Sequence, residues 1–173
     1  MDDRFAVRRT PRLILRRPTE ADLEPMARIS CDPRTNEHRP GGPPTPAQGR
    51  TIVRSFLVDW RRYGIGYWVV ERDGRIVGMT GVKPVAIFGR SCWNLYYRYT
   101  PAVWGLGLAA EAAREAVAAA REHTPGWSVV VRTRPGNAPA TRLARALGMC
   151  RAPDLDGDGF IAFAHPPDEA PLS

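Results

Sequence analysis

The sequence predicts a single domain of the α+β (mixed α/β) class. Segments with the two-residue period of strands alternate with segments of helical period along the chain. With 173 residues, 43% of them hydrophobic, the chain is large enough for one substantial core. No linker or internal repeat divides it. We therefore expect one domain over residues 1–173, with flexible ends at 1–11 and 166–173.

The first half of the chain reads as one strand and two helices. Residues 12–17 form an apolar strand that ends at Pro18. Thr19 and Asp22 have the spacing of a reciprocal N-terminal cap, and the helix they begin carries apolar residues to about position 30. Residues 31–46 are rich in Pro, Gly, Asn and Asp, and so long a loop in a compact domain suggests function. A second helix, at 47–63, has its apolar residues on one stripe.

The second half alternates strands with two further helices. Strands are expected at 66–71, 75–84 and 91–99, and Asp73-Gly74 is a hairpin signal between the first two. An alanine-rich helix at 107–122, small enough in its side chains to pack closely on a sheet, stops before Pro125-Gly126. A β-branched strand at 127–132, a short helix at 138–147 closed by Gly148, and a last strand at 160–163 complete the pattern.

The most informative segment is the turn between the strand at 91–99 and the alanine-rich helix. Gly105 and Gly107 lack a Cβ atom, so a bound group can approach the backbone closely. The first amides of the following helix have no partner within the helix and lie at the positive end of its dipole. Such a turn can bind a phosphate or pyrophosphate without a charged side chain.

Two other interpretations of this turn are open. The spacing of Gly105, Gly107 and Ala110 also satisfies a dinucleotide-binding fingerprint. That fingerprint requires a buried Val/Ile strand before it and an acid about twenty residues after it. Here the preceding strand is aromatic and polar, and residues 124–134 contain no acid. The third interpretation is a plain strand-to-helix turn without a ligand.

The residues around the turn also resemble a known family. The run at 104–112, Trp-Gly-Leu-Gly-Leu-Ala-Ala-Glu-Ala, looks like the acetyl-CoA loop of the GCN5-related N-acetyltransferases (GNAT), in the branch of ribosomal-protein N-terminal (RimJ/RimL-like) enzymes. Trp104 stands where the general family pattern has Gln or Arg. Residues 136–149 resemble the family's Asn-led helix, and residues 13–22 resemble its first strand and helix start. The resemblance implies a central, twisted, mostly antiparallel sheet of six to seven strands flanked by about four helices.

The resemblance further implies an acetyl-CoA-dependent N-acetyltransferase that passes an acetyl group directly to a primary amine, such as a protein N-terminus, an amino acid or a small-molecule amine. It places contacts to acetyl-CoA at Tyr99, Thr100, Trp104, Gly105, Leu106, Gly107, Leu108, Ala109, Asn137, Thr141 and Arg142. Asn137 also has the position of a helix N-cap. Arg142 can pair with a phosphate of coenzyme A or lie on a solvated helix face.

The catalytic residues are less clearly marked. Family members often carry a glutamate on the strand before the loop, and Asn94 replaces it here, where it could still orient a water. Other candidate bases are Glu37, Asp32 and His38 in the long loop, and Glu71 at a strand end. The late tyrosine with which family enzymes often protonate the leaving thiolate is missing, because no tyrosine follows Tyr99. These departures favour one alternative, a regulatory module that binds acyl-CoA without catalysis.

Composition limits the remaining function classes. The formal net charge of +7 and the pI of about 10 would suit nucleic acid, but the basic residues are scattered arginines, with Lys83 the sole lysine, so nucleic-acid binding is disfavoured. Three distant cysteines, Cys31, Cys92 and Cys150, indicate a reducing compartment and are expected to be small buried hydrophobes.

No metal and no membrane contact are expected. The acidic run at 154–159 fits the start of a calcium loop, but His165 stands where the bidentate glutamate should be. The chain start lacks an apolar signal core, and residues 101–120 carry too many charges to span a bilayer. The expected protein is cytoplasmic, with acetyl-CoA and an amine acceptor as its partners, and a homodimer is left open.

Overall fold

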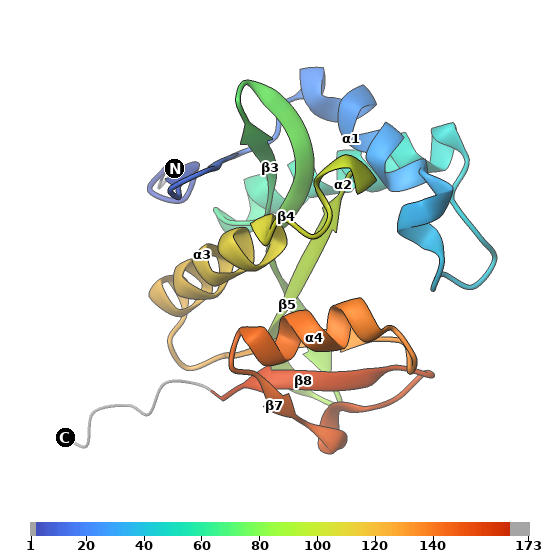
Figure 1. Ribbon diagram of the computed structural model, residues 1–173. Helices are drawn as coiled ribbons and strands as arrows, with labels where there is room; N and C mark the ends of the chain where they lie inside the picture. Colours follow the sequence, from blue (N-terminus) through green and yellow to red (C-terminus); the bar gives the residue numbers. More distant parts are fainter. Residues whose placement is uncertain (1–2, 167–173) are drawn as a thin grey trace.

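The computed structural model describes residues 3–166, and it has the expected α+β architecture. Eight strands form one sheet in the order β1-β2-β3-β4-β5-β6-β8-β7, one strand more than the largest number expected. All neighbouring strands run antiparallel except β5 and β6, which are parallel. Four α-helices flank the sheet within the described residues (Figure 1).

The elements follow one another in a regular alternation. In chain order they are β1 (Val7–Arg9), β2 (Ile14–Arg16), α1 (Leu23–Cys31), α2 (Pro46–Tyr63), β3 (Tyr67–Arg72), β4 (Arg75–Ile87), β5 (Arg90–Tyr99), α3 (Leu108–His123), β6 (Ser128–Thr133), α4 (Ala138–Ala146), β7 (Cys150–Arg151) and β8 (Ile161–His165). Short 3₁₀ turns include η1 (Glu20–Asp22), η2 (Pro33–Asn36) and η3 (Pro101–Val103). The four expected helices and six expected strands are therefore confirmed, with ends that differ by a few residues.

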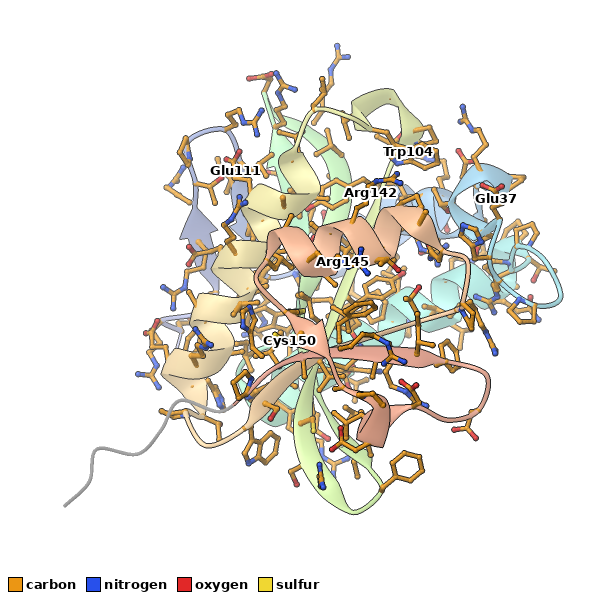
Figure 2. The ribbon with its side chains drawn as sticks, turned by 60° about the horizontal axis from the view of Figure 1, so that its bottom comes forward. Glu37, Trp104, Glu111, Arg142, Arg145 and Cys150 are labelled. Atoms are coloured by element: carbon orange, nitrogen blue, oxygen red, sulfur yellow. The ribbon has the colours of Figure 1, made fainter. Side chains whose placement is uncertain are left out.

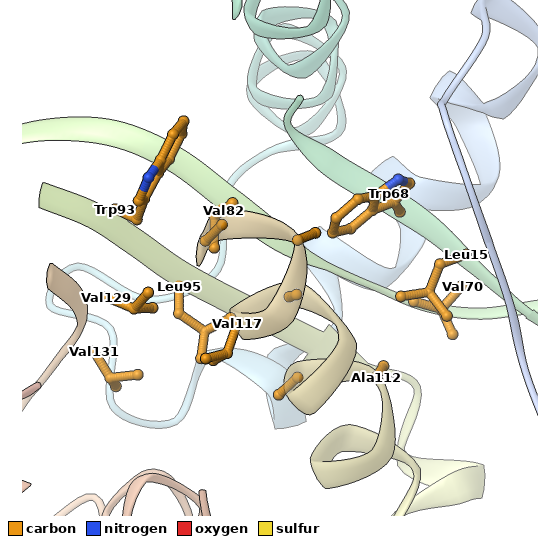
Figure 3. Packing of buried hydrophobic residues seen from close by; sticks show 14 of the residues in the cluster. Leu15, Trp68, Val70, Val82, Trp93, Leu95, Ala112, Val117, Val129 and Val131 are labelled. Atoms are coloured by element: carbon orange, nitrogen blue, oxygen red, sulfur yellow. The ribbon is translucent and has the colours of Figure 1, made fainter. Parts of the chain in front are cut away.

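Helix α3 packs on β4 and β5 and closes the main core on one face of the sheet. Its inner side consists of alanines such as Ala112, Ala116 and Ala119, which are fully buried. Their small side chains let the helix backbone approach Leu95 and Val82 on the sheet (Figure 3). Close packing of an alanine-rich helix was the sequence expectation, and it is confirmed.

Helices α1 and α2 cover the opposite face. Side chains alternate between faces along a strand, and β3 follows this rule: Trp68 and Val70 belong to the core under α3, whereas Tyr67 and Val69 pack with α1 and α2. The apolar stripe of α2, with Phe56 at its centre, makes this second core. The sheet is thus the middle of three layers.

Some expectations need correction. Within the segment 1–11, expected to be flexible, residues 7–9 form β1 and Phe5 is buried in the core. Cys150 is exposed rather than buried, because β7 lies at the edge of the sheet. Of the expected C-terminal tail, residues 167–173 lie outside the described residues. None of the helices within the described residues has the length and apolar character needed to cross a bilayer.

Candidate functional site

The sheet opens between β5 and β6. These parallel strands pair only at residues 92–94 with 128–130, and Asn94 with Val130 is the last pair. Beyond it, residues 95–99 pair with β4 alone and residues 131–133 with β8 alone. Helices α3 and α4 lie beside this divergence (Figure 1). A strand edge inside the sheet is therefore left without a neighbouring strand.

The exposed edge of β5 presents backbone hydrogen-bonding groups to the opening. The amide of Thr100 donates to the carbonyl of Val77 (2.9 Å), on the strand before it. Because antiparallel residues alternate in direction, the amide and carbonyl of Tyr97 face away from β4, and they lie beyond the last pair with β6. An extended ligand could pair with this edge as an added strand would.

The glycine turn stands at the end of this edge. Gly105 and Gly107 have φ angles of 78° and 74°, a left-handed conformation that glycine adopts without strain. Gly107 is the N-cap of α3 and supplies no side-chain cap, so the first-turn amides remain for an external acceptor. The indole of Trp104 donates to the carbonyl of Tyr99 (2.9 Å) and joins the turn to β5.

An ion pair from the start of the chain supports the same turn. Arg12 donates through Nη1 to the carbonyl of Leu106 (2.9 Å) and through Nε to Glu111 (2.6 Å). Thr10 also donates to Glu111. Burial tends to raise the pKa of Glu111, but the hydrogen bonds from Thr10 and Arg12 outweigh it and lower the pKa below its ordinary value. Glu111 is thus ionised, and it holds Arg12 in place against the turn. Arg12 in turn adds positive charge beside the turn.

The start of α4 supplies a second helix terminus near the opening. Asn137 is the N-cap, as predicted, and its side chain accepts from the amide of Ala140 (3.2 Å). Thr141 is half-buried and Arg142 is exposed. In Figure 2 the labelled Arg142 points outward from α4, on the side of the molecule where Trp104 is labelled.

On the other face of the sheet, the start of the opening is polar and aromatic. Tyr67 and Tyr96 lie on β3 and β5, and Gly81 lies between them on β4. Since Gly81 has no side chain, the two rings stack directly, with centroids 4.8 Å apart. Asn94, one step along β5 on the same face, donates to the hydroxyl of Tyr67 (3.0 Å). Burial raises the pKa of Tyr67 and of Tyr96, so both phenols stay protonated.

The other candidate bases, in the loop and on β3, lie in different surroundings. Asp32 is held by Arg34, whose hydrogen bond lowers the pKa of that carboxyl. Glu71 accepts from Arg16 (2.9 Å). Glu37 is exposed, after the end of η2 (Figure 2), and takes no part in the hydrogen bonds around Asn94 in the described chain.

The loop itself is tied to β5 by a residue that the sequence did not single out. Arg98 donates to the carbonyl of Ser30 (3.1 Å), to the hydroxyl of Thr35 (3.1 Å) and to the side chain of Asn36 (2.8 Å). Asn36 is buried, and it donates back to the carbonyl of Ser30 (2.8 Å). This network fixes the start of the loop over the same face as Asn94 and Tyr96.

Together these features define an α+β domain with a split sheet, a glycine turn and two helix termini beside the split. A family model described as Acetyltransferase (GNAT) domain matches residues 12–150. The chain therefore belongs to the GNAT acetyltransferase family, whose members use acetyl-CoA.

Solved structures share this fold over nearly the whole chain. An acetyltransferase from Agrobacterium tumefaciens str. C58 is 23% identical, with a TM-score of 0.79 over 92% of this chain and 93% of that one. A GNAT-family acetyltransferase from Bacillus anthracis is 19% identical, with a TM-score of 0.74 over 94% and 99%. RimL, a ribosomal L7/L12 α-N-protein acetyltransferase in complex with coenzyme A, is 12% identical, with a TM-score of 0.72 over 93% and 97%.

A sequence relative is the uncharacterised protein YkkB of Bacillus subtilis (strain 168), which is 28% identical over 99 residues. That alignment covers 53% of this chain and 58% of YkkB. The chain thus spans somewhat more than half the length of this relative.

Proposed function

We propose that this chain is an acetyl-CoA-dependent N-acetyltransferase that transfers the acetyl group directly to a primary amine of a protein N-terminus, an amino acid or a small molecule. The observation that carries the proposal is the split between β5 and β6, which ends at a glycine turn with uncapped helix amides. Both parts suit one elongated ligand that has amide groups along its length and phosphates at one end.

The proposed contacts divide along the ligand. Tyr99 and Thr100 stand at the end of the β5 edge that would hold the pantetheine amides. The turn and helix start, residues 104–109, would hold the pyrophosphate through main-chain amides. Asn137, Thr141 and Arg142 at the start of α4 would contact the remaining polar groups, and the Arg142 guanidinium suits a phosphate.

The amine would approach from the face that carries α1 and α2. Asn94 lies at the last residue pair before the opening, so its side chain would meet the reacting thioester and amine. We assign Asn94 the role of orienting the amine or a water. Glu37, on the neighbouring loop, is the carboxylate we propose to take up the released proton through solvent.

Two measurements test the proposal in sequence. Isothermal titration with acetyl-CoA should give saturable binding, and no heat of binding at millimolar acetyl-CoA would reject it. A thiol-release assay against a panel of amines should then show turnover. Binding without turnover on any amine would instead support a non-catalytic acyl-CoA-binding module, which Asn94 in place of a carboxylate favours.

A further inference from the structure

The side chain of Tyr67 crosses the sheet to reach the start of the opening. It rises from β3, passes over Gly81 on β4, and places its hydroxyl 3.0 Å from Nδ2 of Asn94 on β5. A Cβ atom at position 81 would lie 2.7 Å from the Tyr67 Cα and 2.2 Å from the Gly66 carbonyl oxygen. Only glycine at this position therefore allows the backbones of β3 and β4 to lie as close as they do beneath the Tyr67 side chain.

Three neighbours pack against the ring of Tyr67. Tyr96 stacks on it, and the Phe56 ring from α2 lies nearly perpendicular to it, with ring centroids 4.9 Å apart. Lys83 from β4 places its ammonium 5.7 Å from the ring centre and 3.8 Å from Asp59 of α2. A buried phenol so confined has one orientation for its hydroxyl oxygen.

This fixed oxygen constrains the neighbouring amide. Asn94 is only partly buried and would otherwise rotate among rotamers. Because Nδ2 directs one of its hydrogens to Tyr67, the amide orientation is set, and Oδ1, its only acceptor, remains for a ligand. An amide oxygen accepts hydrogen bonds but does not take up a proton near neutral pH, so it can orient an amine without serving as its base.

We propose that Tyr67 is a positioning residue: it holds the Asn94 amide so that Oδ1 accepts a hydrogen bond from the amine that attacks the thioester. This inference rests on the proposed acetyltransferase function. It assigns to a residue of β3, distant from the glycine turn in sequence, the task of aligning the acceptor. Acetyl-CoA binding should not depend on it.

A double-mutant cycle tests whether Tyr67 acts through Asn94. Tyr67→Phe keeps the ring and its packing and should lower kcat/KM for the amine about tenfold, the worth of one hydrogen bond, with the Kd for acetyl-CoA unchanged. In an Asn94→Ala background the same change should have no further effect, because the amide it aligns is absent. Additive losses would overturn the proposal, as would a Tyr67→Phe enzyme with wild-type kcat/KM.

A second measurement needs no catalysis and so separates this inference from the proposed function. In the free protein labelled with ¹⁵N, the Asn94 side-chain amide should show slow hydrogen exchange, and Tyr67→Phe should make the exchange fast. Tyr63→Phe, which removes a hydroxyl at the end of α2, is the matched control and should leave the signal unchanged. Fast exchange of the Asn94 amide in the wild-type protein would overturn the inference even if the enzyme is active.

Discussion

Arg12 and Glu111 are joined by a 2.6 Å hydrogen bond between Nε and Oε2, although 99 residues separate them in sequence. The pair connects the segment before β2 to the first turn of α3, and Arg12 also holds the carbonyl of Leu106 in the glycine turn. The glycine turn is therefore held by a residue from the start of the chain. Its conformation depends on an ion pair that local sequence does not reveal.

Glu111→Gln should lower the free energy of unfolding by about 2 kcal/mol at pH 7, because it removes a charged acceptor of three hydrogen bonds. The folded-state pKa of Glu111 lies below its ordinary value of 4.5. Its contribution is thus complete above about pH 4.5 and is lost as the pH falls through the folded-state pKa. Urea titrations from pH 7 to 3 should show the difference between the two proteins shrinking at the acidic end.

Glu122→Gln is the matched control for that experiment, since Glu122 pairs with Arg8 on the exposed side of the same helix. Its effect should stay within about 0.5 kcal/mol. A pH-independent difference for Glu111→Gln would show that its charge does not stabilise the turn.

Gly105→Ala should weaken acetyl-CoA binding at least tenfold while the protein stays folded. Alanine at a φ of 78° costs about 1–2 kcal/mol, which the turn can relieve by moving its amides. Gly64→Ala is a close control, because Gly64 has a φ of 70° and, like Gly105, nothing within 4 Å of an added Cβ atom. Both variants should lose similar stability by thermal unfolding, but titration calorimetry should show weaker binding only for Gly105→Ala.

Arg98→Met should raise the KM for the amine severalfold and leave the Kd for acetyl-CoA unchanged. The substitution removes three hydrogen bonds that fix the loop after α1 and leaves Asn36 buried with fewer partners. We expect a stability loss of about 2–3 kcal/mol. Arg34→Met is the control, because it breaks an exposed ion pair in the same loop. In steady-state kinetics only Arg98→Met should raise the KM for the amine.

Gly81→Ala should be among the most damaging single-methyl changes in the chain. The new Cβ atom would meet backbone at 2.2 Å, which no side-chain rotation can relieve, so a loss of about 3 kcal/mol or more is expected. Gly126→Ala, with nothing within 4 Å, should change stability by less than about 0.5 kcal/mol. Equal midpoints in urea for the two variants would mean that β3 and β4 are not packed as described.

The sequence predicted features that are local in the chain and missed those that join residues far apart in it. The glycine turn, the Asn137 cap and the alanine-rich helix are local patterns, and each was found within a few residues of its place. The bonds of Arg12 to Glu111, Arg98 to Asn36 and Tyr67 to Asn94 join residues 99, 62 and 27 positions apart. Periodicity carries no signal for such pairs, because they form only when the sheet is assembled.

Edge strands were missed for a related reason. β1 and β7 have three and two residues, too few for an alternating pattern to be read, and their pairing comes from the neighbouring strand. The opening between β5 and β6 was not predicted, because no residue pattern marks it. Its position at Asn94 becomes visible only in the strand register.

Amide hydrogen exchange with and without acetyl-CoA tests the central claim most directly. If the ligand pairs with the free edge of β5 and with the uncapped start of α3, the amide of Tyr97 and those of residues 108–110 should become protected together on binding. Protection confined to other parts of the chain, or binding that leaves these amides unchanged, would contradict the account.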